Sequence, residues 1–361
     1  MQKTNSSGQN RKIKEDSSFD IFRQLTALLG MVIIASGLLI YLVYQAYSKA
    51  DLDQLLSVRQ RTVAESGLPG DEHKKSDFWT APDAESISDE DKKALVLYGK
   101  DLIAHTAKYL GPNGTVARIS NGMNCQNYHL DAGTRVFGNN YGSVASTYPK
   151  FRARSGEIED IYKRVNDCFE RSLNGKALDT LSTEMQAIKS YISFLGTNVK
   201  KDEKAKGSGL KDIAFLDRPA DPVKGQQIYI EKCQLCHQKN GEGTLAEDGK
   251  EYIYPPLWGR YAYNDAAGLY RISNFAKYVK YNMPLGVTHE SPQLTDEEAW
   301  DVAAFVNSQS RPHKDVPLDW PDISKKPIDH PFGPFADNFD SKQHKYGPFK
   351  PILAELEKNK K

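Results

Sequence analysis

The sequence predicts a mainly α-helical protein in which two tandem domains follow a single transmembrane helix. Three features predict it: an uncharged run near the N-terminus, a repeated order of helices and loops, and capping boxes at helix starts. With 361 residues, the chain has room for two ordinary domains and additional segments. Its formal net charge is +1, so no overall field indicates nucleic acid or another polyanion as a partner.

The uncharged run extends from Leu25 to Tyr44. A helix rises about 1.5 Å per residue, so this run spans roughly 30 Å, the thickness of the apolar core of a bilayer. It is longer than the apolar part of a signal peptide, typically about 7–15 residues, although a small-residue cleavage site at Ser48–Ala50 leaves that alternative open. We expect residues 1–24 to be cytoplasmic, residues 25–47 to form a transmembrane anchor and residues 48–85 to form a polar stalk.

Two units of the same plan follow the stalk. Each contains a helix, a short motif with cysteine and histidine, a long loop and a closing amphipathic helix. Cys125 and Cys233 are 108 residues apart, and so are His129 and His237, which indicates duplication of a complete domain. The predicted segments are a first domain over 86–199, a charged linker with Gly and Ser over 200–218 and a second domain over 219–311.

Local signals place the main helices. Capping boxes at Ser88–Asp91 and Thr295–Glu298 predict two helix starts, and Asp221-Pro222 predicts a third. Gly111-Pro112 predicts the end of the first helix. The other expected helices are a charged one around Ile158–Arg171 and an amphipathic one that carries Met185, Ile188 and Leu195.

The last segment, 312–361, contains eight prolines and many aromatic side chains. The prolines disfavour regular helices and strands. A disordered tail would be poor in aromatic residues. We therefore expect an extended tail that wraps the folded body.

The second unit contains an intact haem-attachment motif. Cys233 and Cys236 are separated by two residues and followed directly by His237, so one turn of chain offers two thiols to the haem vinyl groups and one axial ligand to the iron. A zinc site is the alternative, but it requires two more ligands, and no matching pair is present in the sequence. The motif predicts a haem c in the second domain.

Met283, in Asn-Met-Pro, is the expected second axial ligand of this haem, and simple core packing is the alternative. A thioether ligand raises the reduction potential of the haem. Pro255 or Pro256 is expected to accept a hydrogen bond from the His237 ring and so to fix its orientation. Because c-type haem is attached outside the cytoplasm, we expect a single-pass protein of the inner (cytoplasmic) membrane with its body in the periplasm.

The first unit contains an altered version of the motif, with Tyr128 in place of the second cysteine. Three interpretations are open. In the first, Cys125 holds a haem through a single thioether and His129 ligates the iron. In the second, the haem is absent and Cys125 forms a disulfide with Cys168. In the third, both cysteines are free, or a haem binds without covalent attachment.

Three stretches carry a specific resemblance: CQNYHLDAG from Cys125, YPKFRAR from Tyr148 and RVNDCFERSLNG from Arg164. Together they resemble the thiosulfate dehydrogenase family, dihaem c-type cytochromes that couple two thiosulfate ions into tetrathionate. The resemblance covers about residues 88–311 and implies two cytochrome c domains. The sequence departs from the family at Tyr128.

The resemblance also implies roles for individual residues. It makes Cys168 the distal ligand of the catalytic haem and Arg154 and Arg164 binding groups for the substrate, with Arg171 and Ser172 as further candidates. Guanidinium groups suit a small dianion such as thiosulfate, because they form paired, charge-assisted hydrogen bonds to oxyanions. A solvated, ion-paired helix face is the alternative for these arginines.

A thiolate ligand lowers the potential of a haem, whereas a thioether raises it. Electrons are therefore expected to pass from the haem beside Cys168 to the haem beside Met283. The thiolate of Cys168 can also leave the iron and attack a substrate sulfur, forming a transient covalent adduct.

These inferences predict a membrane-anchored, periplasmic c-type cytochrome that acts as a thiosulfate dehydrogenase or in reverse as a tetrathionate reductase. Its expected electron partner is a soluble cytochrome or a membrane oxidase. One alternative is an electron carrier without substrate chemistry, in which the first domain lacks haem and holds a Cys125–Cys168 disulfide. A structural or assembly subunit of a larger oxidase is a further alternative.

Overall fold

The structure is a computed structural model that describes residues 28–31, 34–39, 41 and 77–358. The chain divides into two compact units, Met1–Lys75 and Ser76–Lys361. The predicted cytoplasmic segment and most of the predicted anchor and stalk lie outside the described residues. Within the described part, no helix is both long and apolar enough to cross a bilayer. The anchor over 25–47 stays a prediction.

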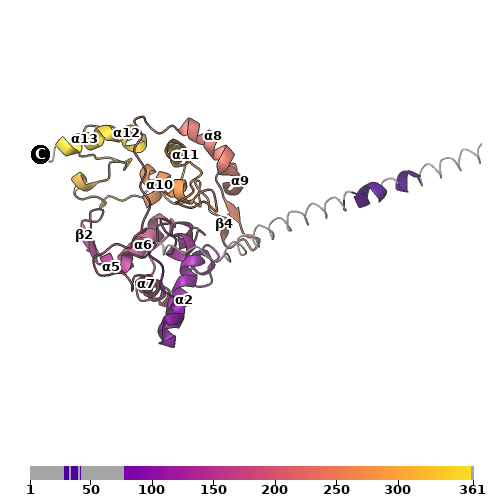
Figure 1. Ribbon diagram of the computed structural model, residues 1–361, viewed down its shortest axis with the longest axis horizontal. Coiled ribbons are helices and arrows are strands. Elements are labelled where there is room, and N and C mark those ends of the chain that lie inside the picture. The colour runs from indigo at the N-terminus through magenta and orange to yellow at the C-terminus, as the bar shows by residue number, and fades with distance from the viewer. Residues whose placement is uncertain (1–27, 32–33, 40, 42–76, 359–361) are drawn as a thin grey trace, which may run out of the picture. The chain divides into compact units, whose positions relative to one another are not determined.

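The first domain is built from helices, with a small hairpin at its edge (Figure 1). Its helices are α2 (Glu90–Ala104), α3 (Thr106–Leu110), α4 (Leu130–Gly133), α5 (Val144–Thr147), α6 (Ile161–Arg171) and α7 (Thr183–Leu195), with 3-10 turns η2 (Ala84–Ser86) and η3 (Cys125–Asn127). The antiparallel strands β1 (Lys150–Arg152) and β2 (Glu157–Glu159) pair directly before α6, so the hairpin and α6 lie on one side of the domain.

The second domain repeats this plan. Its elements are α8 (Pro222–Lys232), α9 (Gln234–His237), the antiparallel strands β3 (Thr244–Leu245) and β4 (Tyr252–Tyr254), the turn η4 (Gly268–Tyr270), α10 (Ile272–Asn282) and α11 (Asp296–Ser308). The prediction of a mainly helical chain with two such domains is confirmed.

In each domain the first helix packs closely across the last one. A Cβ atom on Gly99 of α2 would lie 2.0 Å from the carbonyl oxygen of Ala187 in α7. A Cβ atom on Gly225 of α8 would lie 1.9 Å from the carbonyl oxygen of Asp301 in α11. Only glycine allows helices to approach this closely. The same device in both domains agrees with the duplication inferred from the motif spacing.

Most of the predicted helix starts are correct. Asp221 caps α8 with Pro222 as its first residue, and Thr295 and Glu298 form the expected capping box of α11. The start of the first helix was misplaced by one residue: Asp89, not Ser88, is the N-cap of α2, and its carboxylate accepts a hydrogen bond from the Lys92 N–H at 3.0 Å. A carboxylate at this position also stabilises the helix, because its negative charge lies near the positive end of the helix dipole.

The predicted linker, 200–218, is packed rather than free. The Ala205 N–H donates to the Ser143 hydroxyl at 2.8 Å, and Ala205 is buried. The carbonyl of Lys206 accepts a hydrogen bond from the N–H of Trp79 at 3.0 Å. Trp79 is also buried, so the end of the predicted stalk belongs to the folded body. Both segments look polar in sequence because their contacts are made largely through backbone groups.

The tail runs over both domains, as predicted (Figure 1). Its Asp319 pairs with Arg171 in the first domain, and its Phe349 ring lies 5.6 Å from the Trp300 ring in the second. The prediction that it is extended throughout was wrong. It contains the turn η5 (Ile323–Lys325) and the helices α12 (Ser341–Tyr346) and α13 (Lys350–Lys358). The prolines flank these helices or occupy their first turns, where proline is tolerated.

Candidate haem and substrate site

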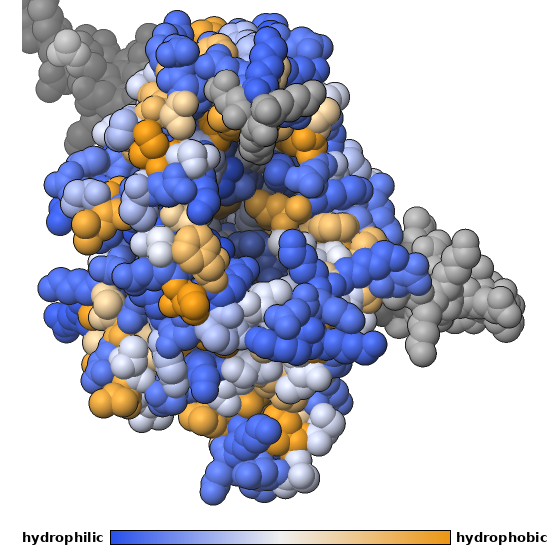
Figure 2. Space-filling model, turned by 90° about the vertical axis from the view of Figure 1, so that its left-hand side faces the viewer, coloured by the Kyte–Doolittle hydropathy of each residue, from blue (hydrophilic) through white to orange (hydrophobic). Residues whose placement is uncertain are grey.

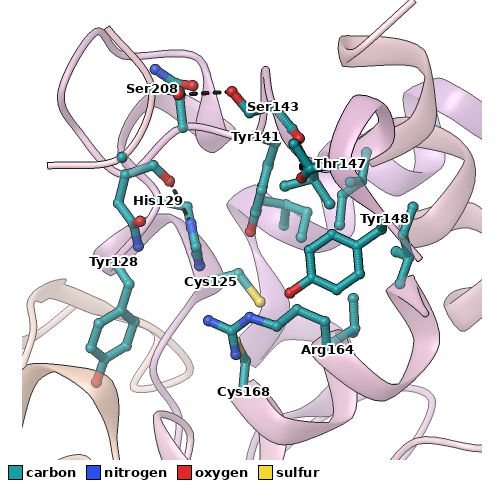
Figure 3. Close-up of a pocket in the computed structure, with 18 of the residues that line it drawn as sticks. Cys125, Tyr128, His129, Tyr141, Ser143, Thr147, Tyr148, Arg164, Cys168 and Ser208 are labelled. Atoms are coloured by element: carbon teal, nitrogen blue, oxygen red, sulfur yellow. Dashed lines mark hydrogen bonds between the residues drawn. The ribbon is translucent and has the colours of Figure 1, made fainter. Parts of the chain in front are cut away.

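The altered motif and α6 face each other across a cavity of about 320 Å³ in the first domain. Cys125 and His129 lie on one side, and Cys168 of α6 lies on the other. Figure 3 shows the His129 ring and the Arg164 guanidinium pointing into this space. The cavity therefore brings together residues that the sequence separates by about forty positions.

The His129 ring is oriented for iron ligation. Its Nδ1 lies 2.6 Å from the Asn139 carbonyl oxygen, so Nδ1 donates and the lone pair belongs to Nε2. The ring stacks on Tyr141 with centroids 4.4 Å apart. Burial lowers the pKa of His129 to about 4, which keeps the imidazole neutral, as a metal ligand must be.

The intact motif has the same geometry. Cys233, Cys236, His237 and Met283 all line a second cavity, of about 340 Å³. The His237 Nδ1 lies 2.8 Å from the Pro255 carbonyl oxygen, which confirms the expected backbone acceptor. Burial also lowers the pKa of His237. The two cavities are almost equal in volume, so the altered site keeps the space that the intact haem site provides.

The remaining residues of the altered motif also fit a haem. Cys125 is buried at the cavity wall, and burial raises the pKa of its thiol to about 12. Tyr128 points away from the first cavity, and its hydroxyl donates to the Ser172 carbonyl at 3.0 Å (Figure 3). Tyr128 lines both haem cavities and so belongs to the wall between them. Its ring therefore does not fill the first cavity. The substitution removes one sulfur and leaves the cavity open.

Helix α6 supplies three of the predicted substrate residues from one face. Arg164 and Cys168 are four residues apart, which places them one above the other. Ser172 is the C-cap residue and lines the cavity on the next turn. Cys168 is the main cause that raises the pKa of Arg164, which places the two side chains close together at the cavity.

A polar cavity of about 350 Å³ adjoins the haem cavity at Cys168, Arg164 and Ser172. Six cationic side chains line it: Arg152, Arg154, Arg164, Arg171, Arg271 and Lys277. Most of them have carboxylate partners, such as Asp319 for Arg171 and Asp329 for Arg271. In the part of the chain that the structure describes, the Arg164 guanidinium forms neither a hydrogen bond nor an ion pair. It is thus available to an anionic ligand.

Arg154 is only partly engaged. Its Nη1 donates to the Ala266 carbonyl at 3.3 Å, and its Nε lies 3.8 Å from Asp319 Oδ2. Burial, followed by the positive charge of Arg171, lowers its pKa to about 10, which leaves it charged at neutral pH. The structure therefore brings Arg154, Arg164, Cys168 and Ser172 around one cavity, and their roles toward a substrate stay a prediction.

Comparisons with known proteins identify the family. A thiosulfate dehydrogenase from Psychrobacter arcticus is 37% identical over 243 residues, which cover 66% of this chain and 71% of that protein. The chain belongs to the thiosulfate dehydrogenase family. A thiosulfate dehydrogenase from Thiomonas intermedia is 34% identical over 234 residues, covering 65% of this chain and 71% of its own length.

Family and structure comparisons agree with this membership. The family described as SoxA/TsdA, cytochrome c domain, matches residues 115–200, and the family described as Cytochrome c matches residues 222–310. The "as isolated" form of thiosulfate dehydrogenase (TsdBA) from Marichromatium purpuratum is similar with a TM-score of 0.62 and 28% identity, over 73% of this chain. This chain covers 55% of that one. The protein is accordingly a c-type cytochrome oxidoreductase with haem c cofactors.

One alternative predicted a first domain without haem, held by a Cys125–Cys168 disulfide. That prediction is wrong for this structure, because both cysteines are free. Both residues line the haem cavity, and the Cys125 N–H donates a hydrogen bond to the Thr106 hydroxyl at 2.9 Å. The cavity of this family member therefore stays open between them.

Sequence reasoning missed Arg152, Arg271, Lys277 and Trp320 as lining residues of the polar cavity. A signal existed for Arg152, because Lys150, Arg152 and Arg154 alternate with other residues, and β1 places alternate residues on one face. Arg271 and Trp320 come from the second domain and the tail, and no local pattern connects them to α6.

The paired arginine of this cavity has a structural role that can be tested. Both Nη atoms of Arg171 lie 2.9 Å from the Asp319 carboxylate, and both side chains are largely buried. Arg171→Ala leaves that buried carboxylate with only the longer contact to Arg154, at 3.8 Å, so we expect the free energy of unfolding to fall by about 2–4 kcal/mol. Urea denaturation followed by far-UV circular dichroism measures this change. Adding Asp319→Asn to Arg171→Ala should restore part of the stability, and an unchanged midpoint in Arg171→Ala would contradict this role.

Proposed function

We propose that the protein is a dihaem thiosulfate dehydrogenase that joins two thiosulfate ions into one tetrathionate ion and releases two electrons. One observation carries this proposal: a haem-sized cavity between His129 and Cys168 opens at Cys168 into a cationic cavity where Arg164 has no partner among the described residues. An electron carrier without a substrate has no need for such a cavity beside its haem.

The residues of the first cavity assign the parts of the haem site. Cys125 would hold a haem through one thioether, and His129 and Cys168 would be its iron ligands. A haem bound there supplies the electron acceptor. Met283 and His237 would play the axial roles in the second cavity, where Cys233 and Cys236 provide both thioethers.

The cationic cavity binds and orients the substrate. Arg164 and Arg154 hold the sulfonate oxygens of thiosulfate by charge-assisted hydrogen bonds, and the Ser172 hydroxyl lies at the same wall. This arrangement aims the terminal sulfur at Cys168.

A covalent route through Cys168 balances. The Cys168 thiolate and one thiosulfate would form a sulfur–sulfur bond with the release of two electrons, for which bound haem would supply the acceptor. A second thiosulfate then attacks the sulfane sulfur of this adduct, releasing tetrathionate and regenerating the thiolate. The reverse sequence reduces tetrathionate, so the same residues serve both directions.

Electrons can leave by a short route to the second domain. Tyr128 lines both haem cavities, and the second cavity is also lined by Asn127 and Leu130 from the altered motif. The Tyr278 hydroxyl donates to the Asn127 carbonyl at 2.7 Å, which ties the two domains together at this place. The thioether of Met283 raises the potential of the second site, so transfer in this direction is favourable. A soluble cytochrome or a membrane oxidase would be the final acceptor.

We also propose that the protein is anchored in the inner membrane with its body in the periplasm. Two sequence features support this location: the uncharged run from Leu25 to Tyr44 and the intact attachment motif, since c-type haem is attached outside the cytoplasm. Protease treatment of spheroplasts would test it, because the body should be digested without breaking the inner membrane.

The function is tested by adding thiosulfate to the purified, oxidised protein. We expect the haem absorption bands to change to those of the reduced form, with one tetrathionate produced for every two electrons taken up. Addition of tetrathionate to the reduced protein tests the reverse direction in the same cuvette. A protein whose haems are reduced by dithionite, but which reacts with neither sulfur compound, would support the electron-carrier alternative.

A further inference from the structure

The cationic cavity has one wall that does not come from either cytochrome domain. Trp320, in the C-terminal tail, lines it together with Arg154 and Arg171. Figure 2 views the molecule from the side on which Figure 1 places β2 and α12, and it shows a hollow bordered mostly by hydrophilic residues. The tail thus contributes to the cavity as well as covering the surface.

Asp319 ties the tail to two cavity arginines. Its carboxylate forms the paired contact with Arg171, at 2.9 Å to each Nη, and lies 3.8 Å from Arg154 Nε. Asp319 and Arg171 are 148 positions apart in the sequence, so only the tertiary fold brings them together. Asp319 pairs closely with Arg171 and only at 3.8 Å with Arg154, so Arg154 and Arg164 keep guanidinium N–H groups for a ligand.

Trp320 holds Arg154 from the other side. The guanidinium carbon of Arg154 lies 5.5 Å from the centre of the Trp320 ring, and the Trp320 N–H donates to the Arg154 carbonyl at 2.6 Å. The indole Nε1–H has no acceptor among the described residues. The side chain is therefore placed by packing, chiefly against Arg154 and the His330 ring, rather than by a hydrogen bond of its own.

The backbone at this point is strained, which indicates that the position of Trp320 is enforced. Its φ is 60°, an uncommon value for a bulky residue. The following residue, Pro321, packs against Gly156 in the turn between β1 and β2, where a Cβ atom would lie 2.6 Å from Pro321 Cγ. The β1–β2 hairpin, which carries Arg152, therefore fits against the tail only because residue 156 is glycine.

We infer that the tail completes the substrate site, with Trp320 as a positioning residue that fixes the Arg154 guanidinium for a small sulfur oxyanion. This inference rests on the proposed function. Among the described residues, the polar contacts of the Arg154 guanidinium are long, at 3.3 Å to the Ala266 carbonyl and 3.8 Å to Asp319, so without the ring the side chain regains rotational freedom. The loss is then expected in substrate binding rather than in the chemical step.

The test uses the full-length holoprotein and three variants. Trp320→Ala removes the ring, and Trp320→Phe keeps an aromatic face while removing the unpaired N–H. Trp79→Ala is the control, since Trp79 is 9% exposed like Trp320 but lines neither haem cavity nor the cationic cavity. For each protein, the measurements are haem per chain, KM and kcat for thiosulfate, and the Kd of sulfate, an inert divalent oxyanion, by calorimetry.

We expect Trp320→Ala to raise both KM and the sulfate Kd by about five- to thirtyfold, the range of a cation–π contact, with kcat changed by less than about threefold. Trp320→Phe should stay within about threefold of the parent protein in both quantities, because the aromatic face remains. Trp79→Ala should change neither quantity, whatever its effect on stability.

Unchanged KM and sulfate Kd in Trp320→Ala would overturn the inference. So would a Phe variant as weak as the Ala variant, an equal rise in Trp79→Ala, or a fall in kcat and haem content at constant KM. If the parent protein does not turn over thiosulfate, the proposed function fails. The sulfate titrations would then still decide whether Trp320 positions the anion site.

Discussion

Cys168→Gly is expected to lower thiosulfate turnover by at least about 10³-fold, the loss typical of removing a nucleophile. Cys168 lines both the haem cavity and the cationic cavity, so its removal takes away both the proposed iron ligand and the sulfur proposed to meet the substrate. The haem at His237 is separate from this change and should keep its spectrum. Steady-state turnover, together with the spectra of both haems, measures the effect.

Glycine near the end of α6 also weakens the helix by about 1 kcal/mol, so Cys168→Ala is the matched variant that separates this effect from the chemistry. Both variants should lose turnover to the same extent, and only the glycine variant should show lower thermal stability. Turnover within about tenfold of the parent protein in either variant would rule out both proposed roles of Cys168.

Arg164→Ala is expected to lower kcat/KM for thiosulfate by about 10²- to 10³-fold, which is what the loss of a paired, charge-assisted contact costs. The guanidinium has no partner within the described residues, so it is held in place for a ligand rather than for the fold. The thermal midpoint should therefore change little, in contrast to Arg171→Ala.

The control for this prediction is Arg118→Ala, because Arg118 is exposed and lines none of these cavities. Arg164→Lys should recover only part of the loss, since an ammonium group cannot form the paired contact. A rise in KM of equal size in Arg118→Ala would show a general charge effect, and normal kinetics in Arg164→Ala would remove this arginine from the substrate site.

The candidate haem ligands could be named from the sequence because each belongs to a short local pattern. His129 and His237 directly follow attachment motifs, and Met283 stands in a short phrase at the distance a small cytochrome domain requires. The structure places all three at the two cavities and adds that each histidine has a backbone acceptor, Asn139 or Pro255. Arg164 and Cys168 were predicted from a distinctive phrase, and their common helix face follows from their spacing.

The tail could not be assigned to the substrate site from sequence. Asp319 meets Arg171 only through tertiary folding, and neither residue belongs to a pattern that indicates the other. The charged segment after Lys200 was interpreted as a free linker because its contacts use backbone groups, as at Lys206. Propensity also misplaced the α2 cap, because serine and aspartate are nearly equal as caps and stand side by side at Ser88 and Asp89.

The most direct test of this account is the intact mass of the purified protein, measured beside its haem spectrum. The account predicts that the chain carries two covalently bound haems, one through Cys233 and Cys236 and one through Cys125 alone. One covalent haem with a mass two hydrogens short would indicate a Cys125–Cys168 disulfide, and one covalent haem with a second that acid acetone extracts would indicate non-covalent binding. Either result would contradict a single-thioether haem between His129 and Cys168.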